Sequence, residues 1–137
     1  MSLRLLLLLS AGGSKTADML ALADTIVIYG AEFGVADENL HGGVNYFLDE
    51  FDTRRELVKE ATRQLVRKGL VRVTPEHDGF RFSIAPQGKA FSDNLESDYA
   101  VEYRQLTAAV NSFIGDKTEN EIFNIMSEIA EKGRGHD

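Results

Sequence analysis

Hydrophobic and polar positions have their clearest periodicity between residues 54 and 89. In the first part of this region, apolar side chains recur at helical spacing, and basic side chains follow the opposite side of the same helix at intervals of four. Residues 70–73 and 80–84 are then predicted to form two strands, joined by a turn over residues 75–79. Gly69 is expected to end the helix in the left-handed conformation. Helix, strand, turn and strand in this order predict a winged helix-turn-helix.

Two helices are predicted before this region. Residues 3–10 are almost wholly apolar and are expected to form a buried helix. Residues 15–29 carry an inward apolar stripe, and Ser14 is available as the N-cap of this second helix. Between residues 30 and 52 the periodicity fails, and glycines and acids indicate a long connection that leads to the basic helix.

Asp24 is a charged residue among the apolar residues of the second predicted helix. We interpret its carboxylate as pointing to the helix edge or capping a neighbouring element. The alternative is a buried carboxylate that pairs with an arginine such as Arg54 or Arg55, because a buried charge requires a partner.

Two amphipathic helices are predicted in the C-terminal part, after a helix start near Lys89. Asp93 and Ser97 are alternative N-caps for the first of them, and residues 118–121 form a capping box that begins the second. The aromatic and apolar residues of these helices are expected in the core or at an interface with a partner. The candidate interface residues are Tyr99, Tyr103, Ile122, Phe123 and Met126.

Length and composition favour a single domain. The chain has 137 residues, of which 43% are hydrophobic, and no repeat or low-complexity linker divides it. Residues 1–132 are expected to form one winged-helix domain with a helical extension at 93–132, followed by a flexible tail at 133–137. The predicted fold class is mainly α, of the α+β type. It has a winged helix-turn-helix core, N-terminal helices, a two-stranded wing and two C-terminal helices.

The apolar run near the start does not indicate export or a membrane span. It is shorter than the roughly 7–15 apolar residues at the centre of a signal peptide. It is also shorter than the roughly 20 residues that cross a bilayer. We therefore expect a cytoplasmic protein with no membrane partner, and the absence of cysteine fits a reducing compartment.

Charge is divided unevenly along the chain, whose formal net charge is −7. Residues 54–89 carry nine Lys or Arg against four acids, whereas the remainder carries six against eighteen. Such a basic region can attract DNA or an acidic partner, although Glu56 and Glu60 could also pair with it on a solvated helix face. The candidate DNA-binding or partner-binding residues are Arg54, Arg55, Lys59, Arg63, Arg67, Lys68, Arg72 and Arg81.

The sequence contains no motif that would support catalysis. Without cysteine and with three scattered histidines, a metal site is not expected. Residues 11–16 resemble the end of a phosphate-binding loop in composition, but their spacing is wrong and a helix precedes them. No acidic pair accompanies the Lys or His of a hydrolase site, and no serine has the setting of a nucleophile. We therefore predict a protein that is not an enzyme and needs no cofactor.

Several stretches, taken in their order along the chain, resemble one family. They are residues 22–29, Leu40-His41, residues 54–58, residues 67–71, and Leu95, Ser97 and Tyr99 followed by Tyr103-Arg104 and Val110. Together they resemble the middle component of ABC-three-component systems, the kind found in Lamassu-like bacterial defence operons. The resemblance covers about residues 3–125.

This resemblance implies a non-catalytic winged-helix adaptor. Its expected partners are an SMC/Rad50-like ABC ATPase and an effector protein of the same operon, often a nuclease, in an anti-phage or anti-plasmid complex. DNA contact is expected within that complex. The alternative function is a dimeric winged-helix transcription regulator, whose basic helix enters the major groove. A third hypothesis, an antitoxin that covers a toxic effector, needs no ATPase.

Overall fold

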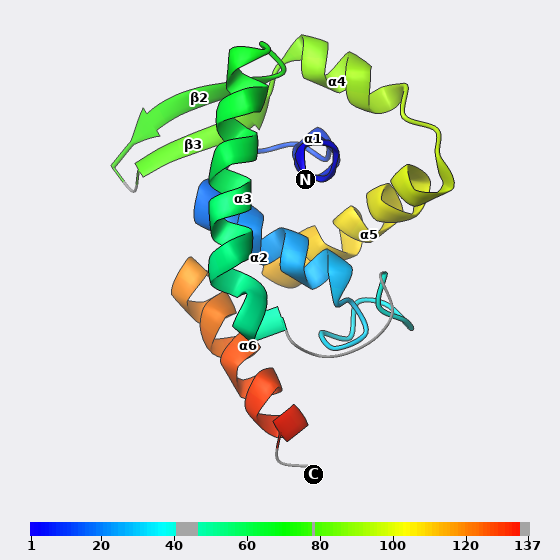
Figure 1. The fold of residues 1–137 in the computed structure, drawn as a ribbon, viewed down its shortest axis with the longest axis vertical. Helices are drawn as coiled ribbons and strands as arrows, with labels where there is room; N and C mark the ends of the chain where they lie inside the picture. Colours follow the sequence, from blue (N-terminus) through cyan, green and yellow to red (C-terminus); the bar gives the residue numbers. More distant parts are fainter. Residues whose placement is uncertain (41–46, 78, 135–137) are drawn as a thin grey trace.

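The computed structural model describes residues 1–40, 47–77 and 79–134, and this part of the chain is mostly helical (Figure 1). A small antiparallel sheet lies at one edge of the helices, and this combination confirms the predicted mainly α, α+β class. In chain order the elements are α1 (Ser2–Ser10), β1 (Lys15–Thr16), α2 (Ala17–Ile28), α3 (Phe47–Arg67), β2 (Val71–Glu76), β3 (Gly79–Ile84), α4 (Pro86–Asp93), α5 (Asp98–Ile114) and α6 (Glu119–Arg134).

Helix α1 lies at the centre of the fold. Its five consecutive leucines, residues 5–9, are all buried. The helix contacts α2, α3, α4, α5 and β3, and Figure 1 shows it nearly end-on with these elements around it. A helix that is apolar on every side has to be enclosed in this way. The prediction of a buried first helix is therefore confirmed.

The sheet has three strands rather than the predicted two. β3 lies in the middle and pairs in antiparallel fashion with β1 and β2. Lys15 and Thr16, which the sequence placed in the second helix, form β1 instead. The Thr16 hydroxyl accepts a hydrogen bond of 3.1 Å from the Met19 N–H and so caps α2. Ser14 was therefore the wrong N-cap, since pairing with β3 holds the next two residues extended.

Two helices begin earlier than predicted. α3 begins at Phe47, inside the stretch interpreted as a connection, and α4 begins at Pro86 rather than near Lys89. Proline suits the first position of a helix because that position needs no N–H. α4 is a third helix after the sheet within the described residues, where two were predicted. A Cβ added to Gly88 would lie 2.0 Å from the Leu70 carbonyl oxygen, so α4 packs directly on the backbone between α3 and β2.

Local signals located the other helix ends well. Gly69 has a φ of +74°, as expected for the residue that ends α3. The Ser97 hydroxyl, rather than Asp93, caps α5. Thr118 and Glu121 form the predicted capping box, in which each backbone N–H donates to the side chain of the other residue at 3.2 Å.

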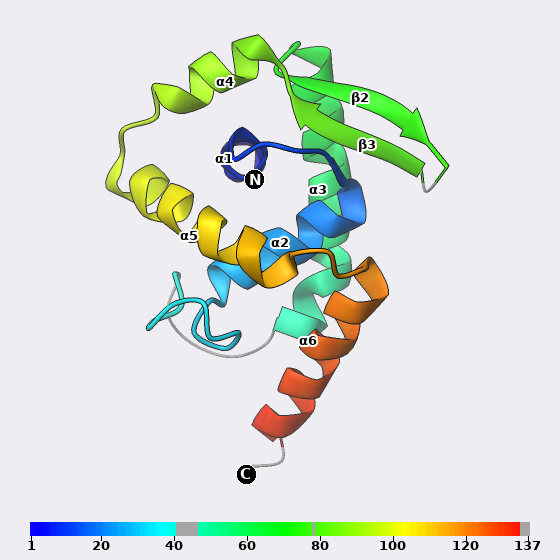
Figure 2. The ribbon, with the colours of Figure 1, turned by 180° about the vertical axis from the view of Figure 1, so that it is seen from behind.

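Helix α6 packs on α2 and α3 and extends away from the sheet (Figures 1 and 2). It continues to Arg134, two residues into the predicted tail, and the rest of that tail lies outside the described residues, as does His41. In the ranges that the structure describes, no helix has the length and apolar character needed to cross a membrane.

Candidate functional site

The basic stripe predicted on α3 is divided by the structure into two parts. Near the start of the helix, Arg54 points into the protein, and only 11% of its side chain is exposed. Further along, Lys59, Arg63 and Arg67 line a groove beside the sheet. The same residue type therefore has a buried role at one end of α3 and a surface role at the other.

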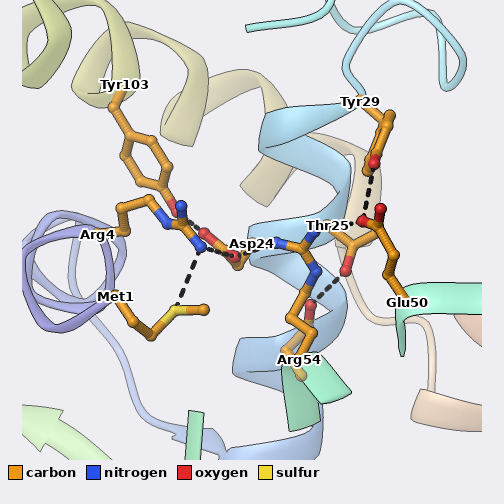
Figure 3. A network of polar contacts seen from close by, with 9 residues as sticks. Met1, Arg4, Asp24, Thr25, Tyr29, Glu50, Arg54 and Tyr103 are labelled. Atoms are coloured by element: carbon orange, nitrogen blue, oxygen red, sulfur yellow. Dashed lines mark hydrogen bonds and ion pairs between the residues drawn. The ribbon is translucent and has the colours of Figure 1, made fainter. Parts of the chain in front are cut away.

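Arg54 belongs to a buried polar network centred on Asp24 (Figure 3). The Asp24 carboxylate is fully buried in α2 and accepts hydrogen bonds from Arg4 at 3.0 Å, Arg54 at 2.8 Å and the Tyr103 hydroxyl at 2.7 Å. These three donors come from α1, α3 and α5, so one carboxylate joins four helices. The favoured interpretation of Asp24 was wrong, and the alternative of a pair with Arg54 is confirmed.

The network continues toward the surface along the first turns of α3. Glu50 lies 3.6 Å from the Arg54 guanidinium and accepts a hydrogen bond of 3.0 Å from the Tyr29 hydroxyl. Burial raises the pKa of Tyr29, and the hydrogen bond to the Glu50 carboxylate raises it further. Burial likewise raises the pKa of Tyr103 well above its usual range, an effect that the charge of Asp24 increases. Both phenols are therefore held as hydrogen-bond donors at neutral pH.

Three of the five predicted interface residues need correction. Tyr103, Ile122 and Met126 are fully buried within this chain, because α5 and α6 turn these side chains toward the core. Tyr99 and Phe123 remain at the surface, with exposed fractions of 39% and 40%. Helical spacing indicates a shared face, but it does not show whether that face is covered by the chain itself.

A groove with a volume of about 660 Å³ lies between α3 and the sheet, and we call it the α3–sheet groove. Most of its apolar lining is contributed by one residue of α3 and three of the strands: Val66, Val73, Phe80 and Phe82. Val73 and Phe82 face each other across the β2–β3 ladder, so they lie on one side of the sheet. Val73 and Phe80 are 42% and 63% exposed, which leaves the outer part of this lining uncovered.

The charged residues of the α3–sheet groove leave it basic. Its two acids are engaged within the chain: Asp18 accepts two hydrogen bonds from Arg55, at 3.1 and 3.3 Å, and Glu119 accepts one from Thr16. Among the described residues, Lys59 and Arg63 pair with exposed glutamates three positions earlier, at 3.5 and 3.3 Å. Such exposed pairs are weak and exchange readily with other partners. Within the described residues Arg67 makes no ion pair.

The remaining cations lie elsewhere. Lys68 and Arg72 are exposed, and strand alternation places Arg72 on the side of the sheet opposite Val73. Arg81 donates a 3.2 Å hydrogen bond to the Ser14 carbonyl and lines a separate pocket of about 580 Å³ together with Lys15. Burial lowers the pKa of Lys15, and the charge of Arg81 lowers it further. The eight predicted cations therefore do not form one continuous surface.

In the described part of the chain, no three His, Asp or Glu side chains come together in a way that could hold a metal ion. The stretch that resembles a phosphate loop in composition forms β1 and the cap of α2, and the Thr16 hydroxyl is used there by Met19 and Glu119.

These features define a small α+β protein with a buried charged centre and an open basic groove. Residues 1–135 match the model of the family described as ABC-three component (ABC-3C) system Middle Component 2. The chain belongs to this family, and it is a middle component of an ABC-three-component defence system. Membership implies interaction with the other components of the system. No curated protein and no solved structure matches the chain.

Proposed function

We propose that this chain is the non-catalytic adaptor of a Lamassu-like system. It bridges an SMC/Rad50-like ABC ATPase and an effector, expected to be a nuclease, in an anti-phage or anti-plasmid complex. The observation that carries the proposal is the family match, which spans residues 1–135 and so accounts for nearly the whole chain as a middle component.

The arrangement of the elements supports a winged-helix fold for this adaptor. Helix, strand, helix, helix and two strands follow one another from α1 to β3, and the sheet order is β1-β3-β2. In this order α3 is the helix that precedes the wing, the position that contacts DNA in winged-helix regulators. A connection longer than the usual three or four residues separates α2 from α3. That length departs from the tight turn of a compact helix-turn-helix.

The non-catalytic part of the proposal is supported by the structural role of the most deeply buried polar groups. Tyr103, whose pKa is strongly raised, is enclosed by the core and cannot reach a substrate. Asp24 is saturated with hydrogen bonds from three side chains. A group that acts on a substrate faces an open cleft, whereas these two buried side chains join helices. The alternative of a dimeric DNA-binding regulator receives no support from the family match.

Co-expression with the neighbouring genes tests the adaptor directly. The tagged chain is purified, and its partners are identified by mass spectrometry and sizing. We expect the ATPase and the effector to co-elute with it, and to separate from each other when this chain is left out. Elution of the chain alone, or an ATPase–effector complex that forms equally well without it, would overturn the bridging role.

A further inference from the structure

We propose that the α3–sheet groove binds an acidic amphipathic segment of another component of the same system. The apolar side of that segment would cover Val73 and Phe80, and its carboxylates would pair with Lys59, Arg63 and Arg67. This inference rests on the proposed adaptor function, which supplies the partner. It adds the place of contact and the chemistry of the segment that is recognised.

The apolar lining extends further into solvent than the fold requires. At the base of the β2–β3 ladder, Val71 is buried and its partner Ile84 is packed against the core. The next pair outward on the same side of the sheet is Val73 with Phe82, and Phe80 follows toward the tip. Exposure rises along this series, reaching 63% at Phe80. A continuous apolar strip of this kind beside a groove marks a contact surface rather than scattered exposed residues.

Lys59, Arg63 and Arg67 form the rim of the groove, and their positive charge favours an acidic occupant. The two acids that line the groove already have partners in the chain, while Arg67 has none among the described residues. In the described ranges, the ion pairs of Lys59 and Arg63 are with exposed glutamates of the same helix. A segment with carboxylates along one edge would meet three cations at helical spacing on α3. A basic segment would be repelled by these cations, and a purely apolar one would make no ion pair with them.

The same features favour a protein segment over a nucleic acid. A nucleic acid backbone is held by cations along its whole path, but the floor of this groove is made of Val66, Val73 and aromatic rings. Arg72 and Arg81, which could have extended a phosphate path, lie outside the groove. The chain as a whole has a formal charge of −7, which opposes association with a polyanion. An amphipathic segment satisfies floor and rim together.

Photocross-linking locates the occupant in the assembled complex. A benzophenone amino acid replaces Phe80 in the chain co-expressed with its neighbouring genes, and the matched control carries it at Phe91, which is 46% exposed on α4. We expect a cross-link from position 80 to a peptide of the ATPase or effector in which acids flank an apolar stripe. Cross-links from position 80 to DNA, to a second copy of this chain or to a basic segment would overturn the proposal.

Two sets of variants test separately how much the apolar floor and the basic rim of the groove contribute to capture of the partner. Val73→Asp with Phe80→Asp, and Lys59→Glu with Arg63→Glu and Arg67→Glu, are each expected to weaken capture of the partner at least tenfold. Phe91→Asp and Arg72→Glu are the controls and should leave capture unchanged. The substituted residues lie at the surface, and the rim set keeps the test valid if the floor set unfolds the chain.

The outcomes separate this inference from the proposed function. Normal capture by both groove variants, with wild-type capture intact, overturns the groove and leaves the adaptor role standing. Failure of the wild-type chain to capture any component overturns the adaptor role and this inference with it. Loss of capture in the groove variants but not in the controls supports both.

Discussion

The two charged regions of α3 differ in what faces them. At the start of the helix, Arg54 faces a buried carboxylate that three helices supply with donors. Near its end, Arg63 and Arg67 face an apolar groove that is open to solvent. A cation that has lost water needs a fixed partner, whereas an exposed cation is free to take one from outside the chain. The same stripe therefore serves folding at one end and is available for binding at the other.

This comparison predicts that the largest loss of stability follows from removing the central carboxylate. Asp24→Asn leaves Arg4 and Arg54 without their buried counter-charge, which should cost about 3–5 kcal/mol of unfolding free energy. Urea denaturation measures the change. The control is Asp18→Asn, which breaks the exposed pair with Arg55 and should cost less than about 1 kcal/mol. Equal losses of unfolding free energy in the two variants would show that the buried ion pairs of Asp24 contribute no more stability than the exposed pair of Asp18.

The second-largest effect on stability is expected from a comparison of two arginines of α3. Arg54→Met removes one of the three donors to Asp24 and should cost about 2–3 kcal/mol. Arg63→Met removes only an exposed pair with Glu60 and should change stability by less than about 0.5 kcal/mol. Thermal and urea unfolding of the two variants side by side would measure the difference. A larger loss for Arg63→Met would contradict the division of α3.

The stability that Tyr103 contributes is expected to depend on pH. Tyr103→Phe removes the hydrogen bond to Asp24 and should cost about 1.5–2 kcal/mol near neutral pH. The folded-state pKa of Tyr103 is raised above the unfolded value of about 10. The folded state therefore keeps its proton longer, and the stability that this proton supports is present below pH about 10 and lost as the pH rises further.

Unfolding free energies measured between pH 9 and 11 test this sign. The wild-type chain should lose stability more steeply across this range than Tyr103→Phe, which has no phenol to ionise at that position. Parallel slopes would show that Tyr103 does not titrate against the fold.

The smallest effect on stability is expected at the rim of the groove. Lys59→Gln, Arg63→Gln and Arg67→Gln together remove three exposed cations, and the unfolding free energy should change by less than about 0.5 kcal/mol. Equilibrium denaturation of this triple variant is the measurement. A loss of unfolding free energy comparable to that of Asp24→Asn would show that the rim cations stabilise the fold and are not free to bind a partner.

Features with local causes were predictable from the sequence. Gly69 ends α3 because only the residues around it decide that conformation, and Thr118 with Glu121 begins α6 through contacts three positions apart. The leucine run of α1 required burial wherever it was placed. Fold class and most helices followed from periodicity of this kind.

Features that depend on distant residues were not predictable. The donors to Asp24 lie 20, 30 and 79 positions away, so the sequence offered Arg54 only as an alternative partner and did not indicate Arg4 or Tyr103. β1 has only two residues and exists because β3 pairs with it. The apolar alternation at Val73 and Phe80 predicted a strand, but it could not show that α3 leaves the outer part of that strand uncovered. The groove is thus a tertiary feature built from residues whose local pattern was already explained.

The central position of α1 affects how the chain folds during its synthesis on the ribosome. Its leucines are enclosed in part by α5, which ends about a hundred residues further along the chain. At a synthesis rate of roughly 5–20 residues per second, these side chains wait about 5–20 s before the last helix that covers them exists. During that interval they are exposed apolar surface, and a nascent chain that ends before α5 is a natural client for chaperones.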